Sequence, residues 1–224
     1  MNIFLSPHPD DVIWSCGDLI ISLLSNKKPV KIITLFDGEE EMGFFNKEQW
    51  RNVANPEIRI KENKQAMEYL SLKNISFHLN DASLRKDSKG QFIYSTIDEI
   101  FKKNHSENEK ILQFIIRKLK EFHRENYIYY APLGIGNHID HIITRRAILN
   151  INPSYLYWYR EFPYDHSLLK ENFQESLPLS EDIDYDKWIK TCLFYKSQIR
   201  YIFKTYSEFK KQHLLFIQKR GYCL

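Results

Sequence analysis

Two short segments of the sequence bring together the residue types that bind metal ions and transfer protons. The first reads SPHPDD at positions 6–11, and the second reads GIGNHIDH at positions 134–141. Each follows an apolar run of the kind that forms a buried strand. The side chains of interest are His8, Asp10, Asp11, His138, Asp140 and His141. Imidazole nitrogens and carboxylate oxygens ligate zinc and also act as general acids and bases, so the pattern predicts a metal-assisted reaction.

Three of these side chains form a candidate metal site. His8 and Asp11 are three residues apart at a loop-to-helix junction, a spacing that can aim both at one point, and His141 could supply a third ligand. Two imidazoles and one carboxylate are a familiar catalytic zinc set, which leaves an open position for water. Zinc lowers the pKa of that water from ~15.7 to about 7 and polarises a substrate carbonyl, which favours hydrolysis. We expect Zn²⁺ as the cofactor, with Fe²⁺ as the alternative because similar ligands accept it.

The other three side chains suit proton transfer. Asp10, next to the candidate ligand Asp11, is the natural general base for the water. His138, one helical turn before His141, could stabilise the tetrahedral oxyanion or protonate the departing amine, with Asp140 holding an imidazole in position. Each spacing alone is common by chance, and an aspartate after a strand often only caps a helix. Together, at two predicted strand ends, they favour a metal site over a structural accident.

The elements that must position these residues alternate between strand and helix. Strands are predicted at 2–5, 30–36, 75–79, 127–131 and 155–159. Helices are predicted at 11–25, 56–72, 108–123 and 139–149, with one or two more at about 185–203 and 207–219. This order predicts parallel β–α–β units in an α/β fold, a Rossmann-like three-layer α/β/α sandwich with a mostly parallel sheet. Because ligands bind outside the carboxyl ends of such strands, Asp37 and Asp81 should join the two segments at one rim.

Two segments, 86–105 and 161–184, interrupt this alternation. We expect both to be long excursions, and such loops often border an active site. Aromatic residues within them are better placed to stack against a sugar than the aromatic residues of the strands. They are Phe92, Tyr94, Phe162 and Tyr164.

The composition is typical of one globular domain spanning residues 1–224. This length suffices for one full hydrophobic core but not for two ordinary domains. The net charge of +3 comes from basic and acidic residues spread along the chain, which gives no electrostatic argument for nucleic acid. The most apolar stretch, 12–24, contains Asp18 and is too short to cross a membrane. Three cysteines without short spacing, and no visible secretory signal, lead us to expect a cytoplasmic protein.

Four stretches make the sequence similar to the PIG-L/LmbE-like metal-dependent N-deacetylases. They are SPHPDDVIWSCGDLI, TLFDGE, RIKENKQAMEYL with LNDASLR, and PLGIGNHIDHIITRRA. The resemblance covers roughly the first 150 residues and implies zinc-dependent removal of an acetyl group. It implies that zinc is bound by His8, Asp11 and His141, that Asp10 is the general base, and that His138 assists the oxyanion.

The same resemblance implies two substrate contacts. Arg59 would help to hold the substrate, and Asp81 would contact a substrate hydroxyl group. The structural alternatives are that Arg59 only pairs with Glu62 on a solvated helix face and that Asp81 only caps a turn.

The sequence departs from the family pattern in two places. Gly17-Asp18 stands where a glycine pair is common, which puts close packing at that turn in question. Arg160-Glu161 stands where an acidic pair is common after the fifth strand, so we expect substrate recognition to differ on that side.

Three functions follow from these observations. The leading hypothesis is a metal-dependent hydrolase in which a zinc-activated water removes the N-acetyl group from an N-acetylated amino sugar or its conjugate. The second keeps the reaction but changes the substrate to another N-acyl amine of natural-product or thiol metabolism. The third is a non-catalytic Rossmann-like binding module, which is disfavoured because the first strand is not followed by G-x-G-x-x-G. The expected partner is a small molecule, and a homo-oligomer is compatible with the sequence.

Overall fold

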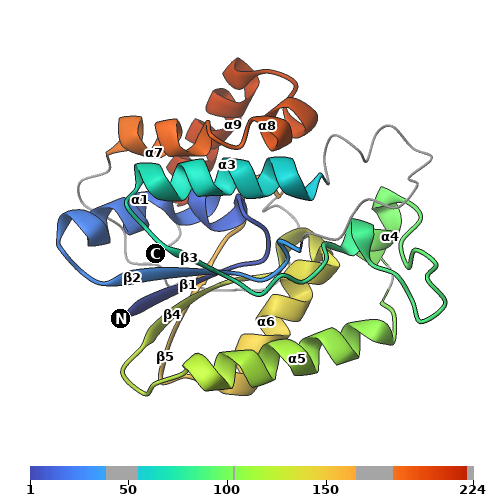
Figure 1. Ribbon diagram of the computed structural model, residues 1–224. Helices are drawn as coiled ribbons and strands as arrows, with labels where there is room; N and C mark the ends of the chain where they lie inside the picture. Colours follow the sequence, from blue (N-terminus) through green and yellow to red (C-terminus); the bar gives the residue numbers. More distant parts are fainter. Residues whose placement is uncertain (39–54, 103, 165–183, 221–224) are drawn as a thin grey trace.

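A five-stranded parallel sheet forms the centre of the fold. The computed structural model describes residues 1–38, 55–102, 104–164 and 184–220 (Figure 1). The strands are β1 (Asn2–Ser6), β2 (Val30–Thr34), β3 (Asn74–Ser76), β4 (Ile128–Pro132) and β5 (Tyr155–Tyr159). They lie in the order β3-β2-β1-β4-β5, and every neighbouring pair is parallel. The predicted α/β class with a parallel sheet is confirmed.

Helices cover both faces of the sheet. One layer contains α1 (Asp11–Ser25), α3 (Pro56–Tyr69), α7 (Tyr185–Cys192), α8 (Lys196–Ile202) and α9 (Tyr206–Arg220) (Figure 1). The other contains α5 (Glu107–Phe122) and α6 (Ile139–Ile151), and the short α4 (Ile97–Lys102) lies near the end of the sheet (Figure 1). None of the helices in the described ranges has the length and apolar character needed to cross a membrane.

Both faces of the sheet are buried, which explains why the strand sequences are continuously apolar. In β1, Phe4 packs in the apolar cluster beneath one helical layer, whereas Ile3 and Leu5 pack in the cluster beneath the other. Successive side chains of a strand point to opposite faces, so a strand covered on both sides has no polar face. The continuous apolar residues before SPHPDD therefore reflect a central strand.

The strand order brings the two chemical segments together. From β1 the chain moves outward through β2 and β3, and then adds β4 and β5 on the opposite side of β1. The loops after β1 and β4 therefore leave the same edge of the sheet, on the two sides of the point where the order reverses. Ligands of open α/β sheets bind at this point.

The segment 185–203 forms two helices, α7 and α8, rather than one continuous helix. Contacts with α3 fix the break. The Tyr195 hydroxyl donates to Asn63 Oδ1 at 2.9 Å, and the backbone N–H and hydroxyl of Ser197 each donate to the Glu62 carboxylate at 2.7 Å. A carboxylate at the start of α8 is also favoured by the helix dipole. Tertiary contacts thus override the helical periodicity of the sequence.

The segment 86–105, expected to be an irregular excursion, contains helix α4. Its six residues are too few to show a helical period in the sequence, but Ile100 is buried in the apolar cluster shared with α5 and α6. Most of the second excursion, 165–183, lies outside the described residues.

Gly17 allows α7 to approach α1 closely. A Cβ atom on Gly17 would lie 2.2 Å from Cδ1 of Trp188, which is completely buried. Trp188 also donates from Nε1 to the carbonyl oxygen of Ile13 at 2.7 Å. Close packing is therefore present at Gly17 even though Asp18 follows it.

Candidate active site

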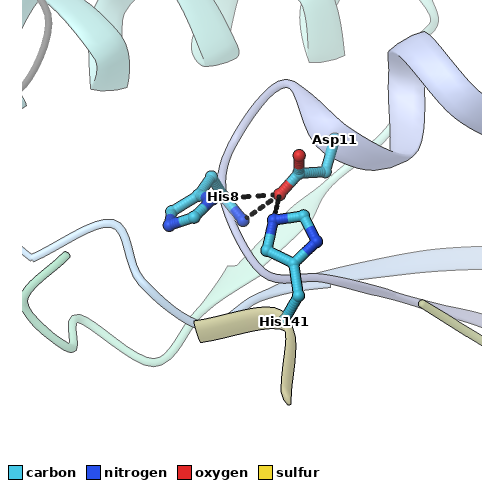
Figure 2. A group of neighbouring side chains, drawn as sticks. All are labelled: His8, Asp11 and His141. Atoms are coloured by element: carbon cyan, nitrogen blue, oxygen red, sulfur yellow. Dashed lines mark hydrogen bonds and ion pairs between the residues drawn. The ribbon is translucent and has the colours of Figure 1, made fainter. Parts of the chain in front are cut away.

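The three predicted metal ligands meet at one point (Figure 2). His8 Nδ1 lies 3.1 Å from Asp11 Oδ2, and His141 Nε2 lies 3.2 Å from the same oxygen. One ligand atom from each residue lies within 4.8 Å of the others. All three residues are buried, although they come from segments that are far apart in the sequence. The structure therefore assembles the set of two imidazoles and one carboxylate that the sequence suggested.

The loop after β1 is shaped by hydrogen bonds among its own residues. Asp11 begins α1, and its Oδ2 accepts from the backbone N–H of His8 at 2.8 Å. The Ser6 hydroxyl donates to the His8 carbonyl oxygen and accepts from the backbone N–H of Val12 at 3.2 Å. These contacts hold the His8 and Asp11 side chains on the same side of the loop.

The loop after β4 depends on glycine. Gly134 and Gly136 have φ values of 78° and 82°, which side chains with a Cβ atom rarely adopt. A Cβ on Gly136 would also lie 2.5 Å from Cδ1 of Tyr164. The loop leads directly into α6, where His138 is the N-cap and His141 lies in the first turn.

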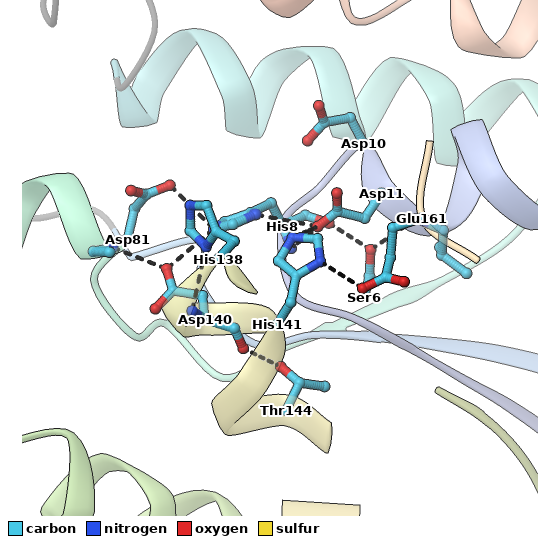
Figure 3. Close-up of polar contacts among 12 residues, drawn as sticks. Ser6, His8, Asp10, Asp11, Asp81, His138, Asp140, His141, Thr144 and Glu161 are labelled. Atoms are coloured by element: carbon cyan, nitrogen blue, oxygen red, sulfur yellow. Dashed lines mark hydrogen bonds and ion pairs between the residues drawn. The ribbon is translucent and has the colours of Figure 1, made fainter. Parts of the chain in front are cut away.

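In each candidate ligand histidine, the ring nitrogen that does not face Asp11 contacts another carboxylate (Figure 3). His8 Nε2 lies 3.1 Å from Asp140 Oδ2 and 3.3 Å from Asp81 Oδ2. His141 Nδ1 lies 3.1 Å from Glu161 Oε1. Carboxylates behind ligating histidines fix the tautomer and ring orientation in many metal sites.

The donor set fits a divalent ion. Within the described residues, His141 Nε2 is buried and makes no hydrogen bond, although it lies 3.2 Å from Asp11 Oδ2. This nitrogen is therefore available to a metal ion. His8 Nδ1 faces the same oxygen. Nitrogen and oxygen donors in this combination suit Zn²⁺ and also Fe²⁺.

The carboxylates of the cluster raise the pKa values of its two candidate ligand histidines. Burial lowers the pKa of His8, but Asp81 and hydrogen bonds to Asp11 and Asp140 outweigh this effect and raise the pKa to about 10. Asp11 and Glu161 similarly outweigh burial and raise the pKa of His141 to about 9. The surrounding carboxylates therefore favour positive charge at this point. Protonated histidines or a bound metal ion can provide that charge.

Arg59 connects Asp10 and Asp81. Its NH2 group donates to Asp10 Oδ1 at 3.1 Å, and its NH1 group donates to Asp81 Oδ2 at 2.9 Å. Burial raises the pKa of the Asp10 carboxyl, and the Arg59 charge opposes this shift. The alternative in which Arg59 only pairs with Glu62 is wrong, because the Arg59 guanidinium donates to Asp10 and Asp81.

Asp81 both caps a turn and faces the cluster. Its Oδ1 accepts from the backbone N–H of Ser83 at 2.9 Å and from the Ser83 hydroxyl at 2.7 Å, at the start of the 3-10 helix Ala82–Leu84. Its Oδ2 contacts Arg59 and His8. The capping alternative is thus correct but incomplete.

His138 adopts a defined tautomer. Its Nδ1 accepts from the backbone N–H of Asp140 at 3.2 Å, which leaves the proton of a neutral ring on Nε2. Burial and the neighbouring His8 charge lower the pKa of His138 to about 3. His138 is therefore a neutral imidazole whose Nε2–H is a hydrogen-bond donor.

Comparison with known proteins agrees with this geometry. The family model described as PIG-L, GlcNAc-PI de-N-acetylase, matches residues 3–152, which is more than half of the chain. The chain belongs to the PIG-L family. A curated relative of this PIG-L protein, the 2'-N-acetylparomamine deacetylase of Niallia circulans, is 24% identical over 235 residues, covering 93% of this chain and 84% of that protein. Because its relatives are deacetylases, this PIG-L protein is an enzyme rather than a non-catalytic binding module.

Solved structures support the same fold. The zinc-inhibited form of teicoplanin deacetylase superposes with a TM-score of 0.71 at 19% identity, covering 89% of this chain and 85% of that one. The deacetylase of the A40926 pseudoaglycone gives a TM-score of 0.62 at 18% identity, covering 89% and 82%. At these identities the likeness establishes the fold of the PIG-L chain and nothing further.

The PIG-L site contains two residues that the sequence analysis did not assign. Glu161, noted only as a departure from the family pattern, lies against His141. Arg85 forms a buried ion pair with Asp140 Oδ1 and donates to Asn108 Oδ1 at 2.9 Å. Glu161 lies two residues after the end of β5, so the strand-end rule also applies to it. Arg85 ends the LNDASLR stretch, one of the four that resemble the family, and this position could have indicated a role in the site.

A cavity of about 270 Å³ opens beside the cluster of this PIG-L protein. The catalytic and substrate-binding candidates that line it are Asp10, Arg59, Asp81 and His138. Phe162 and Tyr164 also line it, as expected for the second excursion. Phe92 and Tyr94 do not: the Lys86 ammonium lies over the Phe92 ring, and the Tyr94 hydroxyl accepts from Asn108.

Asp37 was expected at the rim with the cluster, but the structure places it elsewhere. Its Oδ1 accepts from the Ser76 hydroxyl and from the backbone N–H of His78, and it does not line the cavity. Next to it, the Gly38 N–H donates to the Leu79 carbonyl oxygen at 2.9 Å. The end of β2 is therefore bound to the loop after β3, which removes Asp37 from the rim.

Proposed function

We propose that this chain is a metal-dependent N-deacetylase that removes the acetyl group from an N-acetylated amino sugar or its conjugate. The observation that carries the proposal is the meeting of His8, Asp11 and His141 beside a cavity lined by Asp10 and His138. The substrate class is supported by the curated relative, whose name identifies 2'-N-acetylparomamine as its substrate.

The metal would be held by His8 Nδ1, Asp11 Oδ2 and His141 Nε2, with Zn²⁺ as our first choice and Fe²⁺ as the alternative. When bound, such an ion makes a water molecule acidic enough to act as a nucleophile near neutral pH and polarises the amide carbonyl. The two carboxylates behind the imidazoles, Asp140 and Glu161, hold the ligand nitrogens in the orientation that coordination needs.

Asp10 is the proposed general base. It lines the cavity next to Asp11, and its carboxylate is aimed by the hydrogen bond from Arg59. Burial raises its pKa, which improves a carboxylate as a proton acceptor. The proton that Asp10 takes from water must reach the amine as the C–N bond breaks, and Asp10 can deliver it because it borders the same cavity.

His138 is the proposed donor to the oxyanion. Of the two roles considered from the sequence, the neutral tautomer with Nε2–H favours hydrogen bonding to the developing negative charge over protonation of the amine. Burial and the neighbouring His8 charge lower the pKa of His138, so little of the protonated ring is present at neutral pH, and this disfavours His138 as the acid for the leaving amine.

Arg59 and Asp81 are the proposed sugar contacts. Both are at the cavity wall, and together with Ser83 they offer donors and acceptors suited to hydroxyl groups. Because Arg59 already binds Asp10, substrate binding and the orientation of the base are coupled through one guanidinium group.

The proposal is tested by measuring acetate released from a panel of N-acetylated compounds. The panel contains N-acetylglucosamine, its methyl glycoside and N-acetylated amines without a sugar. We expect acetate from the sugars, loss of release after chelation, and recovery with Zn²⁺. Release that survives complete removal of metal would contradict the mechanism. Hydrolysis restricted to the amines without a sugar would favour the second hypothesis, a deacylase of another N-acyl amine.

A further inference from the structure

The cavity beside the candidate metal centre has an apolar rim. Ile97 of α4 and Tyr201 and Ile202 of α8 line it, and these residues are 42%, 40% and 43% exposed. Single exposed apolar residues are common on protein surfaces. Here, however, three of the ten exposed large hydrophobic residues in the described ranges converge on one cavity from two helices distant in sequence. Figure 1 shows α4 near the end of the sheet and α8 in the helical layer beyond α3.

The apolar surface continues inward to the catalytic candidates. The ring centroid of Phe101, on α4, lies 5.3 Å from that of His138 and 6.3 Å from that of Tyr164. The Tyr164 ring in turn lies 5.2 Å from the His141 ring. The rim and the candidate catalytic residues thus form one continuous surface.

Charge is confined to the buried part of this surface. Among the described residues that line the cavity, the ionisable side chains at the bottom are His8, Asp10, Asp11, Arg59, Asp81 and His138. The exposed lining residues of α4 and α8 carry no charge. The part of the rim formed by α4 and α8 therefore suits an uncharged apolar group, and its described residues offer no ion-pair partner to a phosphate or an ammonium group.

The catalytic candidates lie at the bottom of the cavity, and this determines which end of a substrate contacts the rim. The amide must reach Asp10 and His138, which are 6% and 8% exposed, so the acetyl group and its nitrogen lie at the bottom. The group attached to the sugar then extends toward solvent, between α4 and α8.

We propose that the substrate is an amino-sugar glycoside with an apolar aglycone, and that α4 and α8 bind this aglycone. The inference rests on the proposed function and specifies its substrate class. An aromatic or aliphatic group placed against Ile97, Tyr201 and Ile202 would remove their apolar surface from water, which favours binding in proportion to the area buried.

The test compares two substrates that differ only in the aglycone, the methyl and phenyl glycosides of N-acetylglucosamine. We expect the wild-type kcat/KM to be about tenfold higher for the phenyl glycoside, as the added ring provides several carbons of hydrophobic contact. Ile97→Ser and Ile202→Ser should each reduce this ratio about threefold, since each removes part of the contact surface. The matched control is Leu149→Ser on α6. Leu149 is 50% exposed and does not line the cavity, so this substitution should leave both kcat/KM values unchanged.

Equal kcat/KM values for the two glycosides, or a ratio that survives both rim substitutions, would overturn the inference and leave the deacetylase proposal standing. Faster hydrolysis of an N-hexanoyl than of an N-acetyl methyl glycoside would assign the rim to the acyl chain and overturn it as well. A dimer in size-exclusion chromatography that Ile202→Ser dissociates would assign the rim to a second copy of the chain, with the same consequence. Acetate release from neither glycoside would contradict the proposed function and the inference together.

Discussion

His141 and Glu161 form a completely buried pair, in which Nδ1 of the imidazole lies 3.1 Å from Oε1 of the carboxylate. The same oxygen accepts from the backbone N–H groups of Gly134 at 2.7 Å and Ile135 at 3.2 Å. Glu161 therefore joins the end of β5 to the loop after β4, and it turns Nε2 of His141 toward Asp11. A residue outside the ligand set thus determines the position of one ligand.

We predict that Glu161→Gln weakens Zn²⁺ binding about tenfold or more, because the neutral amide stabilises the ligand imidazole less than a carboxylate does. The fold should persist, as the glutamine Oε1 can still accept from the two backbone N–H groups. Isothermal titration with Zn²⁺ measures the change. Glu109→Gln is the control, since Glu109 makes exposed contacts with Arg146 and Gln113, and neither contact touches the cluster. Equal affinities of wild type and Glu161→Gln would show that this carboxylate does not support the ligand.

We predict that Arg85→Met lowers the free energy of unfolding by about 3–5 kcal/mol, because Asp140 Oδ1 loses its buried guanidinium partner and keeps no ion pair there. Urea unfolding followed by circular dichroism provides the measurement. Arg146→Met removes an exposed ion pair and should cost no more than about 1 kcal/mol. If both variants lose the same stability, Arg85 does not balance the charge of Asp140.

We predict that Asp10→Asn retains Zn²⁺ but reduces turnover about 10²–10⁴-fold, the usual contribution of a general base. The asparagine Oδ1 can still accept from Arg59, so the local structure should be preserved. Metal binding and acetate release are measured on the same preparation, with the exposed Asp98→Asn as control. Metal loss combined with retained turnover would show that Asp10 is a ligand and not the base.

We predict that stability depends on pH through Asp37. Burial raises the pKa of this carboxyl in the folded protein, so the folded state binds more protons than the unfolded state as the carboxyl titrates. The free energy of unfolding therefore falls as pH rises through this range. Asp37→Asn should remove this decrease in stability. The Tm of the variant minus the Tm of the wild type should therefore be larger at pH 7 than at pH 4. A difference that is independent of pH would contradict the assignment.

The position of the site could be predicted from the sequence because two rules apply to its residues. Apolar runs identified β1 and β4, and ligands bind at the carboxyl ends of such strands. His8, Asp11 and His141 meet as expected because the loops after β1 and β4 lie at the point where the strand order reverses.

Other features depend on partners that a single sequence does not reveal. Asp37 also follows a strand, but Ser76 and the His78 N–H bind it and remove it from the rim. Glu161 was assigned no role because its contact with His141 arises only when β5 lies beside β4. The break between α7 and α8 likewise requires α3 at the right distance.

The central claim is that one divalent ion is held by His8, Asp11 and His141. Crystals soaked in Zn²⁺ and measured at the zinc absorption edge test it most directly. We predict one anomalous peak per chain, about 2.0–2.2 Å from His8 Nδ1, Asp11 Oδ2 and His141 Nε2, which is the usual range for zinc with nitrogen and oxygen ligands. A peak bound by other residues, or no peak at this cluster, would contradict the account.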